Sequence, residues 1–149
     1  MAYSNMTENM GTVWFPGKKI AFPMGSVKIY EGSAVFANSG KAVFTPLATG
    51  AFLGVAAEEA DNTGNLGKSI CVYTSGCYEF KCSGIESSNI GQTAYLDTSA
   101  TPNTVTLTKP ATSGDLIVPL GKIVSLRGTD ACMVRIDGYA LKENVTAAV

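Results

Sequence analysis

The chain has 149 residues, of which 46% are hydrophobic and 15% are charged, and it contains no histidine. Without histidine there can be no Ser–His or Cys–His catalytic pair and no imidazole metal ligand. Eleven basic and twelve acidic residues give a net charge of −1. Because the basic residues are scattered rather than clustered, we expect no direct binding of nucleic acid. The length predicts one folded domain.

The first 25 residues carry large apolar side chains without regular alternation, and Pro16 and Pro23 would interrupt a central strand. We therefore expect residues 1–25 to form an extended N-terminal arm that docks on a partner. The residues expected to make the partner contacts are Trp14, Phe15, Phe22 and Met24. The alternative is that the segment folds back and covers one end of the chain's own core.

The start of the chain lacks the basic and apolar regions of a secretion leader. No apolar run has the length needed to cross a membrane as a helix. We therefore expect a protein that is made in the cytoplasm and does not enter a membrane.

Glycine and proline interrupt the rest of the chain so closely that long helices are nearly excluded. Between them lie short runs rich in Val, Ile, Thr, Tyr and Phe, which are typical of strands. The expected strands are residues 26–30, 34–37, 42–45, 52–57, 69–74, 78–82, 93–97, 104–108, 116–125 and 132–137.

Several of these runs alternate apolar and polar residues. In residues 132–137, for example, Cys132, Val134 and Ile136 are expected to point inward while Arg135 and Asp137 point out, which is the period of a half-buried strand. The pattern predicts an all-β fold, a small β-barrel or a β-tulip or sandwich of about ten short strands. We place this domain at residues 26–142 and a flexible C-terminal tail at 143–149.

Two parts of the chain echo each other. The segment starting at Gly32 (GSAVF) is followed by a turn, a Val-rich strand and the segment starting at Phe52 (FLGV). The segment starting at Gly91 (GQTAYL) is likewise followed by a turn, a Val-rich strand and the segment starting at Pro119 (PLGKI). The sequence leaves open whether two similar β-units or a chance likeness of short strands explains the echo.

The chain has four cysteines, which are Cys71, Cys77, Cys82 and Cys132. None of them forms a C-x-x-C pair, so a zinc ribbon or a thioredoxin-type site fits poorly. The first three fall in a predicted hairpin that turns at residues 75–76, which would place Cys71 opposite Phe80. A bond between Cys71 and Cys82 would need a longer turn. We expect all four cysteines to be reduced and to act as small hydrophobic residues.

Residues 58–64 form the most acidic stretch, with Glu58, Glu59 and Asp61. Their oxygens could bind calcium, but the stretch lacks the ligand spacing of a twelve-residue calcium loop. A solvated loop that closes a strand is the favoured interpretation. Since no activated nucleophile, phosphate loop or converging pair of carboxylates is visible, we expect no catalytic residue, no cofactor and no metal.

The order of the strand motifs resembles one protein family. The motifs are EGSAV from Glu31, FLGVA from Phe52, GCYEF from Gly76, GQTAYLD from Gly91, LGKI from Leu120 and VRI from Val134. This series is similar to the capsid cement, or head decoration, proteins of tailed bacteriophages, and it spans about residues 26–137. The cysteines, the long turn between Asp97 and Val105 and the N-terminal arm depart from the family pattern.

The resemblance implies a small β-barrel or tulip-like fold and a homotrimer on the outside of the expanded capsid. At three-fold and quasi-three-fold positions the trimer would cement neighbouring major capsid subunits against the internal pressure of the DNA. A low fraction of charged residues suits a chain that buries surface in an assembly. An apolar arm and exposed strand edges could pair with the partner by strand addition.

An alternative of another class is a β-sandwich module on the virion that binds carbohydrate and mediates host adhesion. Such sites present flat aromatic platforms, and Tyr73, Tyr78 and Tyr95 could supply one if they shared an exposed face.

Overall fold

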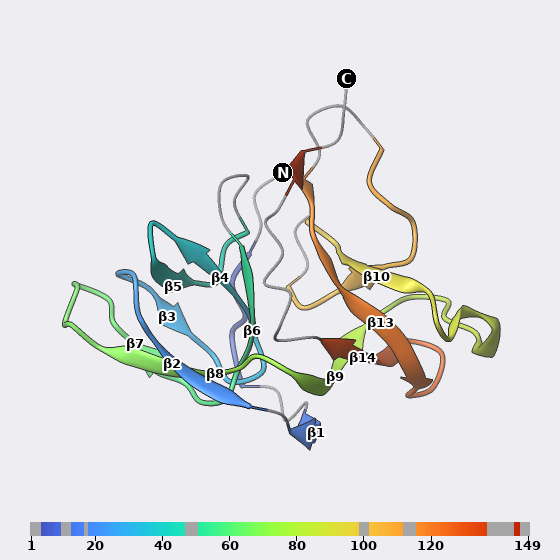
Figure 1. Cartoon of the computed structure of the whole chain (residues 1–149), viewed down its shortest axis with the longest axis horizontal. Coiled ribbons are helices and arrows are strands. Elements are labelled where there is room, and N and C mark those ends of the chain that lie inside the picture. Colours follow the sequence, from blue (N-terminus) through green and yellow to red (C-terminus); the bar gives the residue numbers. More distant parts are fainter. Residues whose placement is uncertain are drawn as a thin grey trace.

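The computed structural model describes residues 4–9, 13–16, 18–46, 51–98, 102–111, 116–136 and 145–146. In this part of the chain the fold is all-β, as predicted, and the single helix is a short 3-10 turn, η1 (Ser87–Asn89). Two antiparallel sheets lie side by side (Figure 1). Among the described residues no helix is long and apolar enough to cross a membrane.

The first sheet has five strands, in the order β2 (Lys19–Pro23), β8 (Ser69–Tyr73), β6 (Phe52–Ala56), β4 (Ala34–Asn38) and β5 (Lys41–Val43). The second has six, in the order β1 (Val13–Pro16), β9 (Gly76–Lys81), β14 (Ala131–Ile136), β13 (Pro119–Leu126), β10 (Thr93–Leu96) and β11 (Val105–Thr106). Two short pairs complete the fold, β3 (Lys28–Ile29) with β7 (Ala60–Asp61), and β12 (Leu116–Ile117) with β15 (Val145–Thr146).

Neither sheet closes into a barrel. Each one bends until two distant strands approach at one end, through a single parallel bridge, the end of β2 with β5 in the first sheet and β9 with the start of β11 in the second. In the first sheet the bridge joins Met24 to Ala42, and in the second it joins Lys81 to Thr104. The fold is therefore two open, strongly bent sheets rather than the one barrel that the sequence suggested as an option.

The two sheets are copies of one architecture. We call residues 18–74 the first unit and residues 76–136 the second unit. In each unit the first strand of the unit pairs with the fifth, the fifth with the fourth, the fourth with the second and the second with the third. The first unit runs β2, β4, β5, β6, β8 in chain order, and the second runs β9, β10, β11, β13, β14. The echo in the sequence therefore corresponds to a repeated β-unit.

The register agrees residue by residue. Val35 lies opposite Gly54 in the first unit, and both units shift register by one residue immediately afterwards. In the second unit Ala94 lies opposite Gly121 at the equivalent place. The central glycine is required in both strands. A Cβ on Gly54 would lie 2.0 Å from the carbonyl oxygen of Tyr73, and a Cβ on Gly121 would lie 1.9 Å from that of Arg135.

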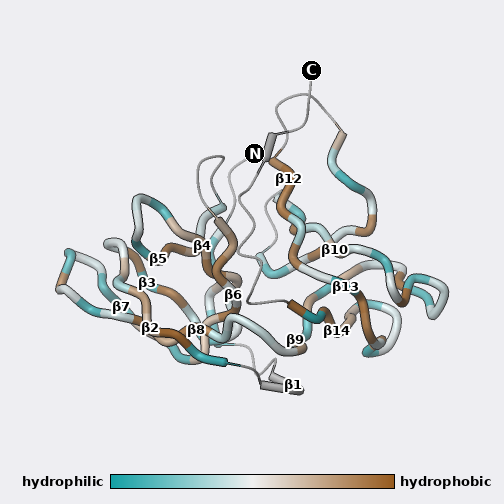
Figure 2. The backbone as a smooth tube through the Cα atoms, viewed as in Figure 1, coloured by the Kyte–Doolittle hydropathy of each residue, from teal (hydrophilic) through white to brown (hydrophobic). Residues whose placement is uncertain are grey.

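The interiors of the units also correspond. Inside the first unit, the buried cluster includes Val35, Leu53, Ile70 and Val72. The equivalent positions in the second unit are also buried, and they are Ala94, Leu120, Cys132 and Val134. Figure 2 shows hydrophobic stretches along β4 and β6, which are strands of the first sheet.

The opposite face of the first sheet joins the units. Its apolar residues Ala34, Phe36, Val43, Phe52 and Val55 belong to the same buried cluster as the interior of the second unit. The equivalent residues of the second unit are Thr93, Tyr95, Thr106, Pro119 and Lys122, and none of these is buried. The outer face of the first sheet thus packs against the interior of the second unit, whereas the equivalent face of the second sheet is more polar and is not buried. The units therefore pack head to tail.

Asn103 forms hydrogen bonds with residues of both units. It is fully buried, and its side-chain amide donates to the carbonyl oxygen of Gly32. Its Oδ1 accepts a hydrogen bond from the backbone N–H of Ala34 at 3.0 Å, and its carbonyl oxygen accepts from Lys81 N–H at 3.1 Å. One residue of the second unit thus satisfies buried backbone groups of the first.

One sequence prediction is wrong at this level. Residues 69–82 do not form a hairpin, since β8 pairs with β2 and β6 whereas β9 pairs with β1 and β14. Cys71 lies opposite Ala21, and Phe80 lies opposite Cys132. The short turn at residues 74–75 is the point where the chain leaves one unit and enters the next, so neighbours in sequence belong to different sheets.

Both ends of the chain differ from the expected arm and tail. Residues 13–16 and 19–23 of the arm are strands paired to β9 and β8 of their own chain. Pro16 and Pro23 are tolerated because each is the last residue of a strand at a sheet edge. In the segment expected to be a flexible tail, Val145–Thr146 pair with β12.

Candidate interaction surface

The four predicted partner contacts lie in different environments. Met24 is 2% exposed and belongs to the interior of the first unit, so it cannot contact a partner in this conformation. Phe22 is half-buried and packs against the same interior. Trp14 and Phe15 have backbones within β1, but their side chains lie outside the described part. The expectation for Met24 is thus corrected, because the alternation of β2 continues into Met24 and directs its side chain inward.

The exposed feature of this region is the outer edge of β2. Its backbone pairs with β8 on one side, and β2 is the terminal strand of its sheet. Lys19, Ile20 and Ala21 are all exposed, and Ile20 is 49% exposed. Lys19 Nζ lies 5.7 Å from the centre of the Tyr73 ring. Nothing in the sequence distinguishes Ile20 from the other apolar residues of this segment.

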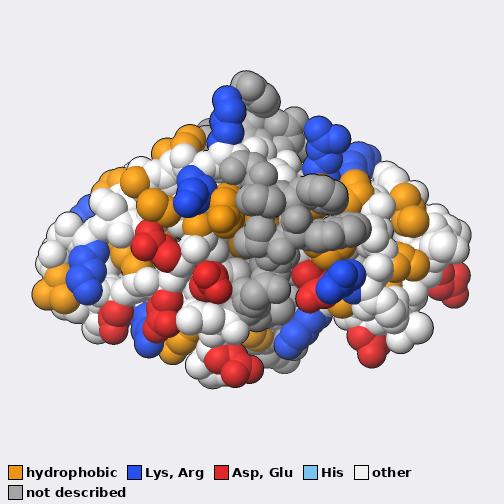
Figure 3. All heavy atoms as spheres, turned by 90° about the horizontal axis from the view of Figure 1, so that it is seen from below, with side chains coloured by type: hydrophobic (Ala, Val, Ile, Leu, Met, Phe, Trp, Pro, Cys, Tyr) orange, Lys and Arg blue, Asp and Glu red, His pale blue; other side chains and the backbone are white. Residues whose placement is uncertain are grey.

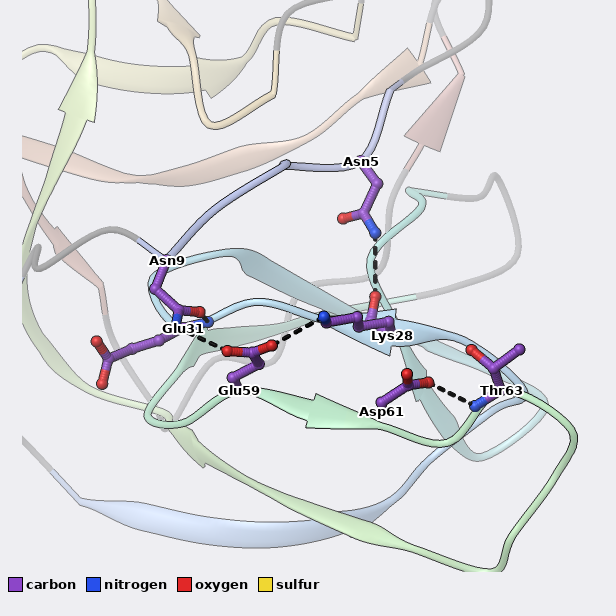
Figure 4. A network of polar contacts seen from close by, with 7 residues as sticks. All are labelled: Asn5, Asn9, Lys28, Glu31, Glu59, Asp61 and Thr63. Carbon is purple, nitrogen blue, oxygen red and sulfur yellow. Dashed lines mark hydrogen bonds and ion pairs between the residues drawn. The ribbon is translucent and has the colours of Figure 1, made fainter.

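Residues 4–9 dock on the β3–β7 pair (Figure 4). The side-chain amide of Asn5 donates to the carbonyl oxygen of Lys28 at 3.1 Å. Asn9 donates to Glu59 Oε2 at 2.8 Å and accepts from the N–H of Glu31 at 2.8 Å. Met6 is buried at 7% exposure. The described part of this segment therefore folds back onto its own chain.

An ion pair lies at the centre of that network. Lys28 Nζ lies 2.9 Å from Glu59 Oε1, and it also sits 4.6 Å from the centre of the Tyr30 ring. The hydrogen bonds from Lys28 and then from Asn9 hold the pKa of Glu59 below its ordinary value. The bond to Glu59 correspondingly raises the pKa of Lys28. Both side chains are solvent-exposed enough for this pair to be sensitive to salt.

The remaining acidic residues of 58–64 have structural partners. Glu58 Oε2 accepts from the N–H of Cys71 at 2.9 Å, and Asp61 Oδ1 accepts from the N–H of Thr63 at 2.9 Å. Asn62 is buried, donates to the carbonyl oxygens of Met24 and Gly25, and accepts from Lys68 N–H. Within the described residues no three Cys, Asp or Glu side chains are grouped as metal ligands. The favoured interpretation of a solvated loop is therefore only partly right, since Ala60–Asp61 form strand β7 and Asn62 is buried.

The described cysteines are free thiols. Cys82 and Cys132 are both buried in the second unit. Burial raises the pKa of Cys132 to about 12. Cys71 and Cys77 are half-buried. The contact with Glu58 raises the pKa of Cys71. The two buried cysteines fill positions that Met24 and Ile70 occupy in the first unit, which is the behaviour of small hydrophobic residues.

The predicted tyrosine platform does not form. Tyr78 is fully buried, donates its hydroxyl to the carbonyl oxygen of Ser75 and stacks on Tyr73 with ring centres 5.5 Å apart. Tyr95 is half-buried on β10, opposite Thr106. A buried ring cannot stack on a sugar, so these three tyrosines do not present one exposed aromatic face.

No family model matches the sequence, and no curated protein matches it significantly.

Proposed function

We propose that this chain is a structural virion protein of a tailed phage. It binds the outside of the expanded capsid, as a homotrimer at three-fold and quasi-three-fold positions, and joins neighbouring major capsid subunits against the pressure of the packaged DNA. Its partner is the major capsid protein.

The observation that carries the proposal is the position of the motifs that resemble the cement family. Two of them, FLGVA and LGKI, contain Gly54 and Gly121, which sit at equivalent places where neighbouring backbones nearly touch. The motifs starting at Glu31 and Gly91 supply the strands opposite these glycines. The motifs behind the resemblance thus include residues that build the repeated unit, and this supports the proposal.

The surface is compatible with a binding role. The face seen in Figure 3 carries Lys and Arg side chains interspersed with Asp and Glu, with hydrophobic side chains between them. The open edge of β2 offers a place for strand pairing. Repetition of one modest contact around a symmetric shell would give strong attachment through multivalency.

The test is co-sedimentation of the purified chain with shells that lack it, in the expanded and the unexpanded form. We expect binding to the expanded shell, saturation at a fixed ratio to the major capsid protein and a higher temperature of shell disruption. If the chain remained in the supernatant with both forms of the shell, the proposal would be wrong.

A further inference from the structure

The two units differ in how their first strands are covered. In the second unit, β1 pairs antiparallel with the outer edge of β9, with Val13 opposite Tyr78 and Phe15 opposite Cys77. In the first unit, the equivalent strand β2 has β8 as its one neighbouring strand among the described residues. The same architecture is therefore covered at one edge and open at the other.

The open edge has hydrogen-bonding groups to offer. Thr74 N–H donates to Lys18 at 2.8 Å, and Met24 N–H donates to Lys68 at 3.0 Å, so residues 18, 20, 22 and 24 direct their backbone groups toward β8. The backbone groups of Lys19, Ala21 and Pro23 consequently face outward. Proline has no N–H, which leaves the amides of Lys19 and Ala21 as the outward donors.

Apolar side chains on β2 are also more exposed than those at the equivalent positions of β9. Ile20 is 49% exposed, whereas Tyr78, at the equivalent place on β9, is fully buried. Phe22 is half-buried, whereas its equivalent Phe80 is fully buried. An added strand would shield apolar surface here, as well as pair with the free backbone groups.

Two lysines lie beside the edge. Lys19 lies on the strand itself, and Lys68, whose charge also lowers the pKa of Asp61, lies next to its end. Neither residue takes part in an ion pair within the described part of the chain, where the ion pairs are Lys28–Glu59 and Arg127–Glu79. A segment with acidic residues flanking an apolar one would complement this edge.

The number of strands argues against exchange of β1 between copies of this chain. Among the described residues there are one β1 and two equivalent edges, on β9 and β2. If β1 of a second copy moved to β2, it would uncover the β9 edge of its own chain, and the count of open edges would not change. Copies of this chain exchanging β1 therefore cannot cover every edge.

We propose that the outer edge of β2 accepts an extended acidic segment of the major capsid protein, in the position that β1 occupies on β9. The added strand runs antiparallel to β2, pairs with the amides of Lys19 and Ala21 and covers Ile20 with an apolar side chain. This inference rests on the proposed function and names the surface through which it operates.

The test uses the full chain and expanded shells that lack it. Ala21→Pro removes one outward N–H and leaves the β8 bonds intact, and Ala21→Val is the control that keeps this N–H at the same exposed position. Ile20→Thr removes the apolar contact, and Val124→Thr is its control at an exposed strand position, 38% exposed. We expect Ala21→Pro and Ile20→Thr to weaken shell binding by about tenfold or more and the two controls to bind like wild type.

Hydrogen exchange provides a readout that does not depend on folding of the proline variant. In the wild-type chain, the amides of Lys19 and Ala21 should exchange quickly when free and slowly when bound to the shell. Wild-type binding with unchanged exchange, and with equal affinity for Ile20→Thr, would overturn the edge proposal and leave the proposed function standing. A chain that binds no shell at all would overturn both, and a change in self-association alone would assign the edge to a second copy.

Discussion

Two glycines decide whether the repeated unit can form. At Gly54 and Gly121 any side chain would collide with the carbonyl of the neighbouring strand, and Gly54 also has φ +148. We expect Gly54→Ala and Gly121→Ala each to lower the free energy of unfolding by more than about 3 kcal/mol, because steric overlap and backbone displacement add to the loss of the native conformation. Urea denaturation of each variant measures this.

The matched control is Gly128→Ala. Gly128 has φ +79, but a Cβ there would meet no atom within 4 Å. Its cost should be limited to the backbone strain of about 1–2 kcal/mol. If all three variants lost the same stability, then close strand approach would not be the reason for glycine at residues 54 and 121.

Glu59 should make the docking of residues 4–9 depend on pH. Its pKa is lower in the folded chain than the ordinary 4.5, because Lys28 and Asn9 bond to the carboxylate. The stabilisation is therefore complete above about pH 4.5 and is lost as the pH falls through the lowered folded value. We expect the amide of Glu31, which donates to Asn9, to lose exchange protection over that range. In Glu59→Gln this dependence should disappear; a similar pH dependence in the variant would assign it to another group.

At the scale of elements, a truncation series should show that β1 is dispensable for folding and that β2 is not. Removal of residues 1–17 deletes β1 and leaves both five-stranded units intact. Removal of residues 1–24 also deletes β2 and Met24, which uncovers Ile70 and Val72. We expect the first truncation to keep a native near-ultraviolet circular dichroism spectrum and a cooperative melt, and the second to lose both. Equal stability of the two would contradict the assignment of β2 to the first unit.

The strands that the sequence predicts well are short runs of strand-forming residues bounded by turn residues. The segments at Phe52, Thr93 and Cys132 reappear as β6, β10 and β14, with bounds shifted by a residue or so. By contrast, the prolines of β1 and β2 disfavour a central strand, so the sequence predicts an arm there. The local sequence does not show that both strands lie at sheet edges, where proline is tolerated. Their partners, β9 and β8, are more than 40 residues away in the chain.

The candidate surface was harder to predict for a related reason. Large apolar side chains favour Phe22 and Met24 as contact residues, yet Met24 is buried and Phe22 is half-buried, while Ile20 is exposed on β2, the terminal strand of its sheet. The similar segments at Gly32 and Gly91 belong to the two repeated units. Their similarity identifies a repeat only when the strand register is known. Pairing of Val35 with Gly54 and of Ala94 with Gly121 is a long-range fact that no short motif encodes.

At the scale of the whole molecule, Asn103 should couple the two units. Asn103→Gly keeps the unusual backbone of this residue, φ +50, and removes the side-chain bonds to Gly32 and Ala34. Both partner groups are then buried without a bond, so we expect a loss of about 2–4 kcal/mol in the free energy of unfolding. The control Asn38→Ala, at an exposed position, should change it by less than about 0.5 kcal/mol. Scanning calorimetry should show one transition for the wild-type chain, because one buried cluster spans both units; two separate wild-type transitions would show that the units fold independently.

The most direct test of the account is the copy number of this chain in purified virions, relative to the major capsid protein, by quantitative mass spectrometry. A shell-wide cement predicts a ratio near one to one, or one to one less a fixed set of unoccupied positions. A ratio of a few per cent would contradict this account and place the chain at a tail or a vertex, and absence from the particle would remove the virion role altogether.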